Sequence, residues 1–165
     1  NVGQVPVHYN EYFTGRPFDP KSDVVMYRSN YRDIPNTPLY PFGYGLSYTT
    51  FAYSDLTINK NQMTADEQIT ASITLKNTGD RTGTETVQLY IRDCFGSVVR
   101  PRKELKDYQK VTLQPGEEKT IFFNINEEML RFCKVDMSFG SEPGEFHVYI
   151  GTDSSTEEYV AFELI

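Results

Sequence analysis

The feature that most constrains how this chain can fold is a period-two alternation of apolar and polar residues that begins at about Glu67. In residues 69–75 every odd-numbered position is apolar and every even-numbered position carries a hydroxyl group. Side chains on a strand point alternately to its two faces, so one face of this segment packs inward and the other meets water. A helical repeat is missing from this half of the chain, apart from one helical turn expected at residues 127–131. The pattern therefore predicts a domain built from strands.

Six further segments have strand-like patterns and are separated by turn signals. They are residues 51–59, 86–92, 108–113, 119–125, 146–150 and 158–164. Seven strands in roughly 115 residues is the count and size of an immunoglobulin or fibronectin type III sandwich. The Cys, Trp and Cys signature of true immunoglobulin domains is absent, because the chain contains no Trp. We therefore predict an all-β fold, a seven-stranded immunoglobulin/fibronectin type III-like antiparallel β-sandwich with an extended N-terminal arm.

Turn-forming residues suggest how these strands connect. Residues 77–83 are rich in Asn, Asp and Gly, so we expect the strands on either side of them to be neighbours. In residues 114–117, Pro presets a turn and Gly supplies conformational freedom, which predicts a hairpin. A second Pro-Gly turn is expected at residues 142–145, where the chain reverses into the strand at 146–150.

The first fifty residues read as an arm, because prolines interrupt any regular element while aromatic residues recur between them. The prolines are Pro6, Pro17, Pro20, Pro35, Pro38 and Pro41. Residues 3–9 look like a short edge strand that needs a sheet to join. We therefore divide the chain into an arm, residues 1–50, and a sandwich, residues 51–165, and expect the arm to pack at least partly along the sandwich.

Composition and charge exclude several classes of function. The chain has 165 residues, which suits one domain with an appendage. Its 16 basic and 23 acidic residues give a net charge of -7, and the basic residues are scattered, which argues against nucleic acid and anionic membrane as partners. No stretch approaches the ~18 apolar residues needed for membrane insertion. The chain starts with Asn1 and shows no targeting signal, so we expect a fragment or a processed piece.

Several runs of residues form a distinctive set along the chain. They are residues 2–10 (VGQVPVHYN), 14–17 (TGRP), 38–51 (PLYPFGYGLSYTTF), 77–79 (NTG), 87–91 (VQLYI), 100–101 (RP), 103–106 (KELK), 113–117 (LQPGE) and 142–146 (EPGEF). Taken in this order, they resemble the C-terminal region of glycoside hydrolase family 3 β-glucosidases. Single pieces are weak signals, but their order and the run at 38–51 are specific. Phe139 departs from the pattern, since relatives often carry Trp there, and we expect its smaller ring to fill the same kind of hydrophobic position.

This resemblance implies a parent enzyme with a catalytic barrel first, an α/β domain second and a fibronectin type III-like domain last. The arm would then include the last strand of the α/β domain. The aspartate nucleophile and the glutamate acid/base of such enzymes both lie upstream, so no catalytic residue and no cofactor is expected here. The implied partners are the upstream domains of the same parent chain. The implied parent activity is hydrolysis of terminal non-reducing β-D-glucosyl residues, in the periplasm or outside the cell.

Other residue groups could in principle carry chemistry of their own. The acidic pairs are Asp66-Glu67, Glu117-Glu118, Glu127-Glu128 and Glu157-Glu158. A retaining glycosidase needs two carboxyl groups about 5–5.5 Å apart, whereas adjacent strand residues point to opposite faces, so solvated charge is the better interpretation. His8 and His147 have no Cys or carboxylate at ligand spacing, and Ser47 lacks a nucleophile elbow, so no metal site or nucleophile is expected. Cys94 and Cys133 fit no zinc motif and are expected to be unpaired.

Two functions remain open, a structural domain and a carbohydrate-binding module. Arm aromatics offer faces on which sugar rings could stack, although we favour a role in holding the arm between domains. These weak substrate-binding candidates are Tyr40, Phe42, Tyr44 and Tyr48. A binding module that contacts oligosaccharide would instead need an exposed aromatic row on one sheet face, with Tyr90, Phe122 and Tyr149 as the outward-facing candidates. A generic spacer domain is less favoured, because it has no need of the aromatic arm.

Overall fold

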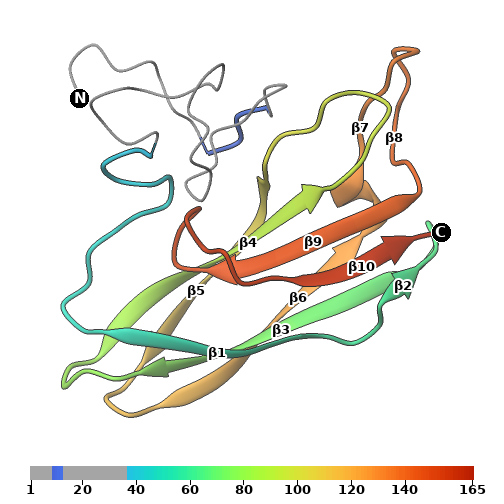
Figure 1. Ribbon diagram of the computed structural model, residues 1–165. Helices are drawn as coiled ribbons and strands as arrows, with labels where there is room; N and C mark the ends of the chain where they lie inside the picture. Colours follow the sequence, from blue (N-terminus) through green and yellow to red (C-terminus); the bar gives the residue numbers. More distant parts are fainter. Residues whose placement is uncertain (1–8, 13–36) are drawn as a thin grey trace, which may run out of the picture.

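Two facing β-sheets make up most of the computed structural model, which describes residues 9–12 and 37–165 (Figure 1). The first sheet has the order β1-β3-β6 and contains β1 (Phe51–Ile58), β3 (Gln68–Asn77) and β6 (Glu118–Asn126). The second has the order β2-β10-β9-β4-β5 and contains β2 (Gln62–Met63), β4 (Gly83–Asp93), β5 (Glu104–Leu113), β9 (Gly144–Gly151) and β10 (Val160–Leu164). A 3-10 helix occupies Glu127–Leu130, as the sequence suggested. The predicted all-β sandwich is confirmed.

The core lies between the inner faces of the two sheets. In β3 the alternation is realised fully, since Ile69, Ala71, Ile73 and Leu75 are at most 2% exposed. The second sheet contributes the inward-facing residues of β4 and β9, which are Val87, Leu89, Ile91, Phe146, Val148 and Ile150. Burial of these apolar side chains is the main term that stabilises the fold, at roughly 25 cal/mol per Å².

The expected pairing of the strands around residues 77–83 is wrong. β3 pairs with β1 and β6, whereas β4 pairs with β5 and β9 in the opposite sheet. The segment between β3 and β4 therefore crosses from one sheet to the other. Such a crossing keeps the apolar face of each strand toward the same core, so face alternation alone cannot distinguish it from a hairpin.

The hairpin predicted at the Pro-Gly turn is wrong for the same reason, although the turn itself forms. Glu117 N donates to Gln114 O at 3.0 Å, and Gly116 has a φ of 75°, which suits glycine. The strands it joins, β5 and β6, belong to different sheets. Turn chemistry fixes a reversal of the chain but does not decide which strand becomes the hydrogen-bonding partner.

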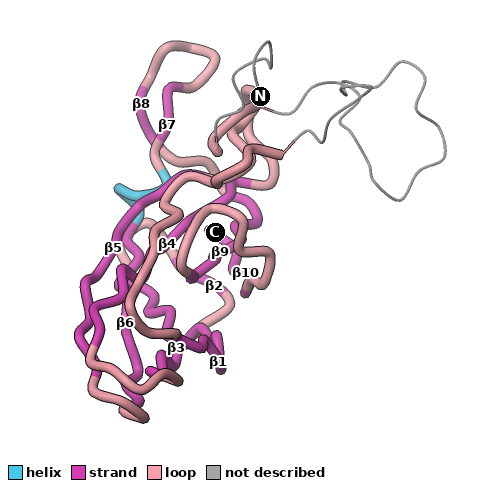
Figure 2. Tube along the Cα trace, turned by 90° about the vertical axis from the view of Figure 1, so that its left-hand side faces the viewer, coloured by secondary structure: helices cyan, strands magenta, loops and turns pink. Residues whose placement is uncertain are grey.

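A short hairpin projects beyond the sandwich, as the rotated view shows (Figure 2). It consists of β7 (Phe132–Cys133) and β8 (Phe139–Gly140), and Val135, Met137 and Phe139 are exposed on it. The expectation that Phe139 fills a hydrophobic position is therefore wrong within this chain, because β8 extends away from the core.

The side chain of Asn77 is fully buried and joins separate segments of the chain. Its Nδ2 donates to Arg81 O at 2.7 Å and to Leu113 O at 3.0 Å. Its Oδ1 accepts from Thr49 Oγ1 at 2.8 Å and from Gly79 N at 3.1 Å. All four hydrogen-bonding positions of the amide are thus used. The bonds tie the end of the arm and the end of β5 to the sheet crossover.

Thr49 lies so close to the crossover that two of its neighbours must be glycine. A Cβ atom added to Gly79 would overlap Thr49 Oγ1, and one added to Gly83 would overlap Thr49 Cγ2. One residue along, Thr78 N donates to Thr50 O at 2.8 Å. The arm is therefore bound to the sandwich by close backbone approach immediately before β1 begins.

Aromatic rings hold two described parts of the arm against the outer face of β4. Tyr9 stacks on Phe42 with ring centroids 4.1 Å apart and an interplanar angle of 17°. It also meets Tyr90 edge to face at 5.9 Å. Nearby, Glu11 Oε1 lies 2.7 Å from Arg102 Nε, and Glu11 O accepts from Arg102 N at 2.9 Å. The predicted packing of the arm along the sandwich is confirmed for these residues; most of the expected edge strand lies outside the described residues.

Polar contacts also hold the arm against the outer face of β4. Gln88 Nε2 donates to Gly43 O at 3.1 Å, and Tyr90 Oη donates to Gln88 Oε1 at 2.6 Å. Ser154 N donates to Phe42 O at 2.9 Å. Because the arm covers its outer face, β4 is buried on both faces from residue 87 to residue 91. The period-two pattern of exposure is lost there.

Replacing Asn77 should strongly destabilise the sandwich. We expect Asn77→Ala to lower the free energy of unfolding by about 3 kcal/mol, because it leaves buried carbonyl groups without donors. Urea denaturation followed by tyrosine fluorescence measures this loss. Asn124→Ala is the matched control, since its side chain accepts one exposed bond from Thr70 Oγ1 and should cost less than about 0.5 kcal/mol. Equal losses in the two variants would contradict the role of Asn77.

Replacing Gly43 should release the arm without unfolding the sandwich. Gly43 has a φ of 84°, and an added Cβ would overlap the Gln88 side chain, whereas Gly45 has open space around it. In Gly43→Ala we expect the Ser154 amide to exchange with deuterium at least about tenfold faster, which corresponds to about 1.4 kcal/mol. Gly45→Ala should leave this rate unchanged. If both variants behave like the wild type, Gly43 does not anchor the arm.

Candidate functional site

The four aromatic residues proposed for sugar contact all lie on the described arm and are exposed. Tyr40 and Tyr44 lie together, with ring centroids 5.2 Å apart and an interplanar angle of 37°. Phe42 instead stacks on Tyr9, so one face of its ring is already in use. Tyr48 is 93% exposed. Tyr40 and Tyr44 therefore form an exposed pair, whereas Phe42 holds the arm on the sandwich.

The outward side of the arm is strongly apolar. In addition to the four aromatic side chains, Leu39 and Leu46 are 83% and 90% exposed. We call these six side chains the arm surface; they are Leu39, Tyr40, Phe42, Tyr44, Leu46 and Tyr48. Single exposed apolar residues are common, but six within ten residues form a patch of the kind that contacts other macromolecules.

A small recess lies between the arm and β4. Gly43, Leu46 and Ser47 line one side of it, and Thr86 and Gln88 line the other. Its volume is about 110 Å³, whereas pockets for small-molecule ligands usually measure about 300–1,000 Å³. Inside it Ser47 Oγ accepts a hydrogen bond from Thr49 N at 3.3 Å, which is a local turn contact.

The outward-facing aromatic row proposed for the sheet is not realised by its three candidates. Tyr90 is 0% exposed and Tyr149 is 6% exposed, so both predictions are wrong, while Phe122 is 59% exposed as predicted. The arm covers Tyr90, and Lys103 Nζ lies 4.2 Å from the centre of the Tyr149 ring. Phe122 lies on β6, in the other sheet. These rings cannot form a common platform.

Burial also changes the acidity of the covered groups. Desolvation raises the pKa of both the Tyr90 and the Tyr149 phenol, and it lowers the pKa of the Lys103 ammonium group. Lys103 Nζ donates to Thr156 O at 2.6 Å. These side chains therefore act as buried packing groups beneath the arm and the loop after β9.

Most residues of the acidic pairs are solvated charges, as expected. Glu117, Glu118, Glu157 and Glu158 are exposed. Glu127 differs, because it accepts from Ser141 Oγ at 2.6 Å and lies 2.7 Å from an Arg131 nitrogen. The hydrogen bond from Ser141 is the main cause of its lowered pKa. Glu127 thus serves to link the 3-10 helix to the segment after β8.

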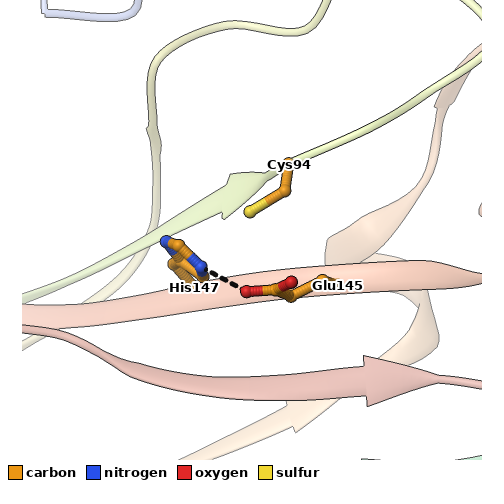
Figure 3. A group of neighbouring side chains, drawn as sticks. All are labelled: Cys94, Glu145 and His147. Atoms are coloured by element: carbon orange, nitrogen blue, oxygen red, sulfur yellow. Dashed lines mark hydrogen bonds and ion pairs between the residues drawn. The ribbon is translucent and has the colours of Figure 1, made fainter.

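Three potential metal ligands meet at the ends of β4 and β9 (Figure 3). Cys94 directly follows β4, while Glu145 and His147 lie two residues apart on β9 and therefore on one face. Their donor atoms all lie within 4.8 Å of one another, and His147 Nε2 is 2.7 Å from Glu145 Oε1. The expectation that neither histidine has a Cys or carboxylate nearby is therefore wrong for His147; His8 lies outside the described residues.

The strand ladder explains how the fold assembles this group. Arg92 pairs with His147, and Cys94 N donates to Glu145 O at 3.1 Å, so Cys94 lies opposite Glu145. The Glu145 and His147 spacing could have been read from the sequence as one strand face. Cys94 could not, because its position depends on the register between two strands that are about fifty residues apart in the chain.

The surroundings of the group are partly closed. Tyr159 stacks on the His147 ring at 4.0 Å with an interplanar angle of 13°. Side-chain exposure is 12% for His147 and 53% for Glu145. Burial is the main cause of a raised pKa for the Cys94 thiol. Cys94 and Cys133 are both free thiols, as predicted.

Comparison with known proteins gives this architecture a family. Residues 85–154 match the family of fibronectin type III-like domains. Over all 165 residues the chain is 47% identical to the periplasmic β-glucosidase of Salmonella typhimurium, and it covers 21% of that protein. It is 43% identical over 164 residues to a putative β-xylosidase of Formosa agariphila, covering 99% of this chain and 20% of that one.

A solved structure agrees over nearly the whole chain. The β-glucosidase of Listeria innocua, in complex with glucose, has a TM-score of 0.89 and 41% identity, covering 99% of this chain and 22% of that one. This chain thus spans about a fifth of the length of the relatives it matches. No helix among residues 9–12 and 37–165 is long and apolar enough to cross a membrane. The chain thus contains a fibronectin type III-like domain and is similar, over nearly its whole length, to the C-terminal part of glycoside hydrolase family 3 β-glucosidases.

Proposed function

We propose that this chain is the non-catalytic C-terminal structural domain of a family 3 glycoside hydrolase and that it stabilises or positions the catalytic domains. The observation that carries the proposal is the arm surface, whose six large apolar side chains are exposed to solvent in this chain. In this proposal residues 1–50 include the last strand of an upstream α/β domain, and residues 51–165 are the fibronectin type III-like sandwich.

The two sides of the arm support this role. Its inner side is fixed by the Gln88 and Asn77 amides and by the Tyr9–Phe42 stack, so the arm has a defined position on the sandwich. Its outer side is left apolar, and burying such side chains against another domain contributes about 1.5–3 kcal/mol for each one fully covered. The upstream domains of the same parent chain are the proposed partner, because the relatives are about five times as long as this chain.

The parent activity we propose is hydrolysis of terminal non-reducing β-D-glucosyl residues. The resemblance to β-glucosidases supports this activity. One relative is named a putative β-xylosidase, so β-xylosides are the competing class of substrate. A periplasmic or extracellular location is proposed from the relative named as periplasmic. The catalytic groups would lie on the upstream domains.

A carbohydrate-binding module is the second candidate function. The exposed Tyr40 and Tyr44 pair favours it, because a tilted pair of phenol rings offers stacking surface to a sugar. Burial of Tyr90 and Tyr149 weighs against it, since it removes the sheet platform that such a module would use.

Polar substitutions in the arm surface should separate the structural role from other roles. We expect Leu46→Ser and Tyr48→Ser to change the unfolding free energy of the 165-residue chain by less than about 0.5 kcal/mol, because both side chains are exposed in it. In the parent enzyme the same changes should lower the thermal midpoint, because they weaken the interface between domains. Phe122→Ser, exposed on the other sheet, is the control and should leave the midpoint unchanged. An unchanged midpoint in all three variants would contradict the proposed interface.

Calorimetric titration of the chain with cello-oligosaccharides and laminari-oligosaccharides tests the second function. The structural role predicts no saturable heat. Saturable heat that disappears in Tyr40→Ala and Tyr44→Ala, and persists in Phe122→Ala, would identify a binding module at the Tyr pair. That result would replace the structural proposal as the main function of the arm surface.

A further inference from the structure

We propose that Cys94, Glu145 and His147 form a divalent metal site suited to zinc (Figure 3). They offer one sulfur, one oxygen and one nitrogen donor, and zinc binds all three types. Three protein ligands leave a fourth tetrahedral position for water. The site is independent of the arm surface and of the proposed function.

The backbone already sets the spacing of the ligands. Glu145 and His147 project from the same face of β9, and the hydrogen bond from Cys94 N to Glu145 O fixes the third residue beside them. Their donor atoms lie within 4.8 Å of one another. Metal–ligand bonds of about 2.0–2.3 Å in a tetrahedron need donors roughly 3.3–3.8 Å apart. Side-chain adjustments of about 1 Å would therefore close the site without moving either strand.

Each side chain is suited to its part in that adjustment. Glu145 is half-exposed, so its carboxylate can turn away from the 2.7 Å hydrogen bond to His147 Nε2 and toward a metal ion. The His147 ring is held by stacking on Tyr159. Its Nδ1 is buried with no hydrogen-bond partner among the described residues.

An ion can reach the group from solvent. Cys94 lines an open concavity of about 500 Å³ together with Phe95, Ser97 and Val99. Cys94 is a free thiol. Binding then replaces the sulfur–hydrogen bond by a sulfur–zinc bond and releases one proton to the buffer.

Cobalt(II) is the probe for the first test, because it substitutes for zinc and reports its ligands by absorption. Titration of the reduced 165-residue chain should give a near-ultraviolet thiolate-to-cobalt band and visible bands of a tetrahedral ion, and added zinc should remove them. We expect Cys94→Ser to abolish the near-ultraviolet band and His147→Gln to weaken cobalt binding at least about tenfold. Cys133→Ser, which removes the other free thiol, is the matched control and should keep the band. Absence of the band in the wild type, or its survival in Cys94→Ser, would overturn the proposal.

A second measurement needs no variant and so does not depend on the folding of Cys94→Ser. The wild-type chain is alkylated with iodoacetamide with and without zinc, and the modified cysteines are mapped by mass spectrometry. We expect zinc to slow alkylation of Cys94 at least about tenfold and to leave Cys133 unchanged. Equal protection of both thiols, or of neither, would show that zinc does not bind at this group.

Discussion

The side-chain amide of Asn77 lies where the arm, the sheet crossover and the end of β5 meet, and it is fully buried. A buried amide without partners is costly, so the surrounding segments must present their carbonyl, hydroxyl and amide groups in one arrangement. Thr49 can reach this amide only because residues 79 and 83 are glycine. The Asn77 amide therefore fixes both the position of the arm and the path of the chain between the two sheets.

The cover provided by the arm changes the character of the second sheet. An antiparallel sheet usually leaves one face to water, but here Gln88 and Tyr90 are buried beneath Tyr9, Phe42 and Gly43. The outer face of β4 is therefore closed to binding partners where the arm covers it. The surface available to a partner or a sugar is the exposed side of the arm, and the aromatic residues of the sheet serve to hold that layer in place.

Beyond the arm contacts, the same sheet face carries a different group of side chains, at the end of β4 and the start of β9. Cys94, Glu145 and His147 come together there because the β4–β9 register places Cys94 across from Glu145. The same two strands thus contribute their inner faces to the core and their outer faces to the proposed ligand group. The ladder hydrogen bonds give the ligand group the rigid backbone that a metal site needs.

Period-two alternation and turn residues are local signals, and they predict the seven longer strands, their inward faces and the 3-10 helix. They miss the two-residue strands β2, β7 and β8. The runs at 38–51 and 113–117 are specific enough to indicate the resemblance to family 3 β-glucosidases. The folded chain, in contrast, decides which strands pair, buries Tyr90 and Tyr149, and brings Cys94 to His147. Alternation tells which side chains share a face of a strand, but not what covers that face. Pairing, cover and register depend on contacts between residues far apart in the chain, and those contacts exist only once the core has formed.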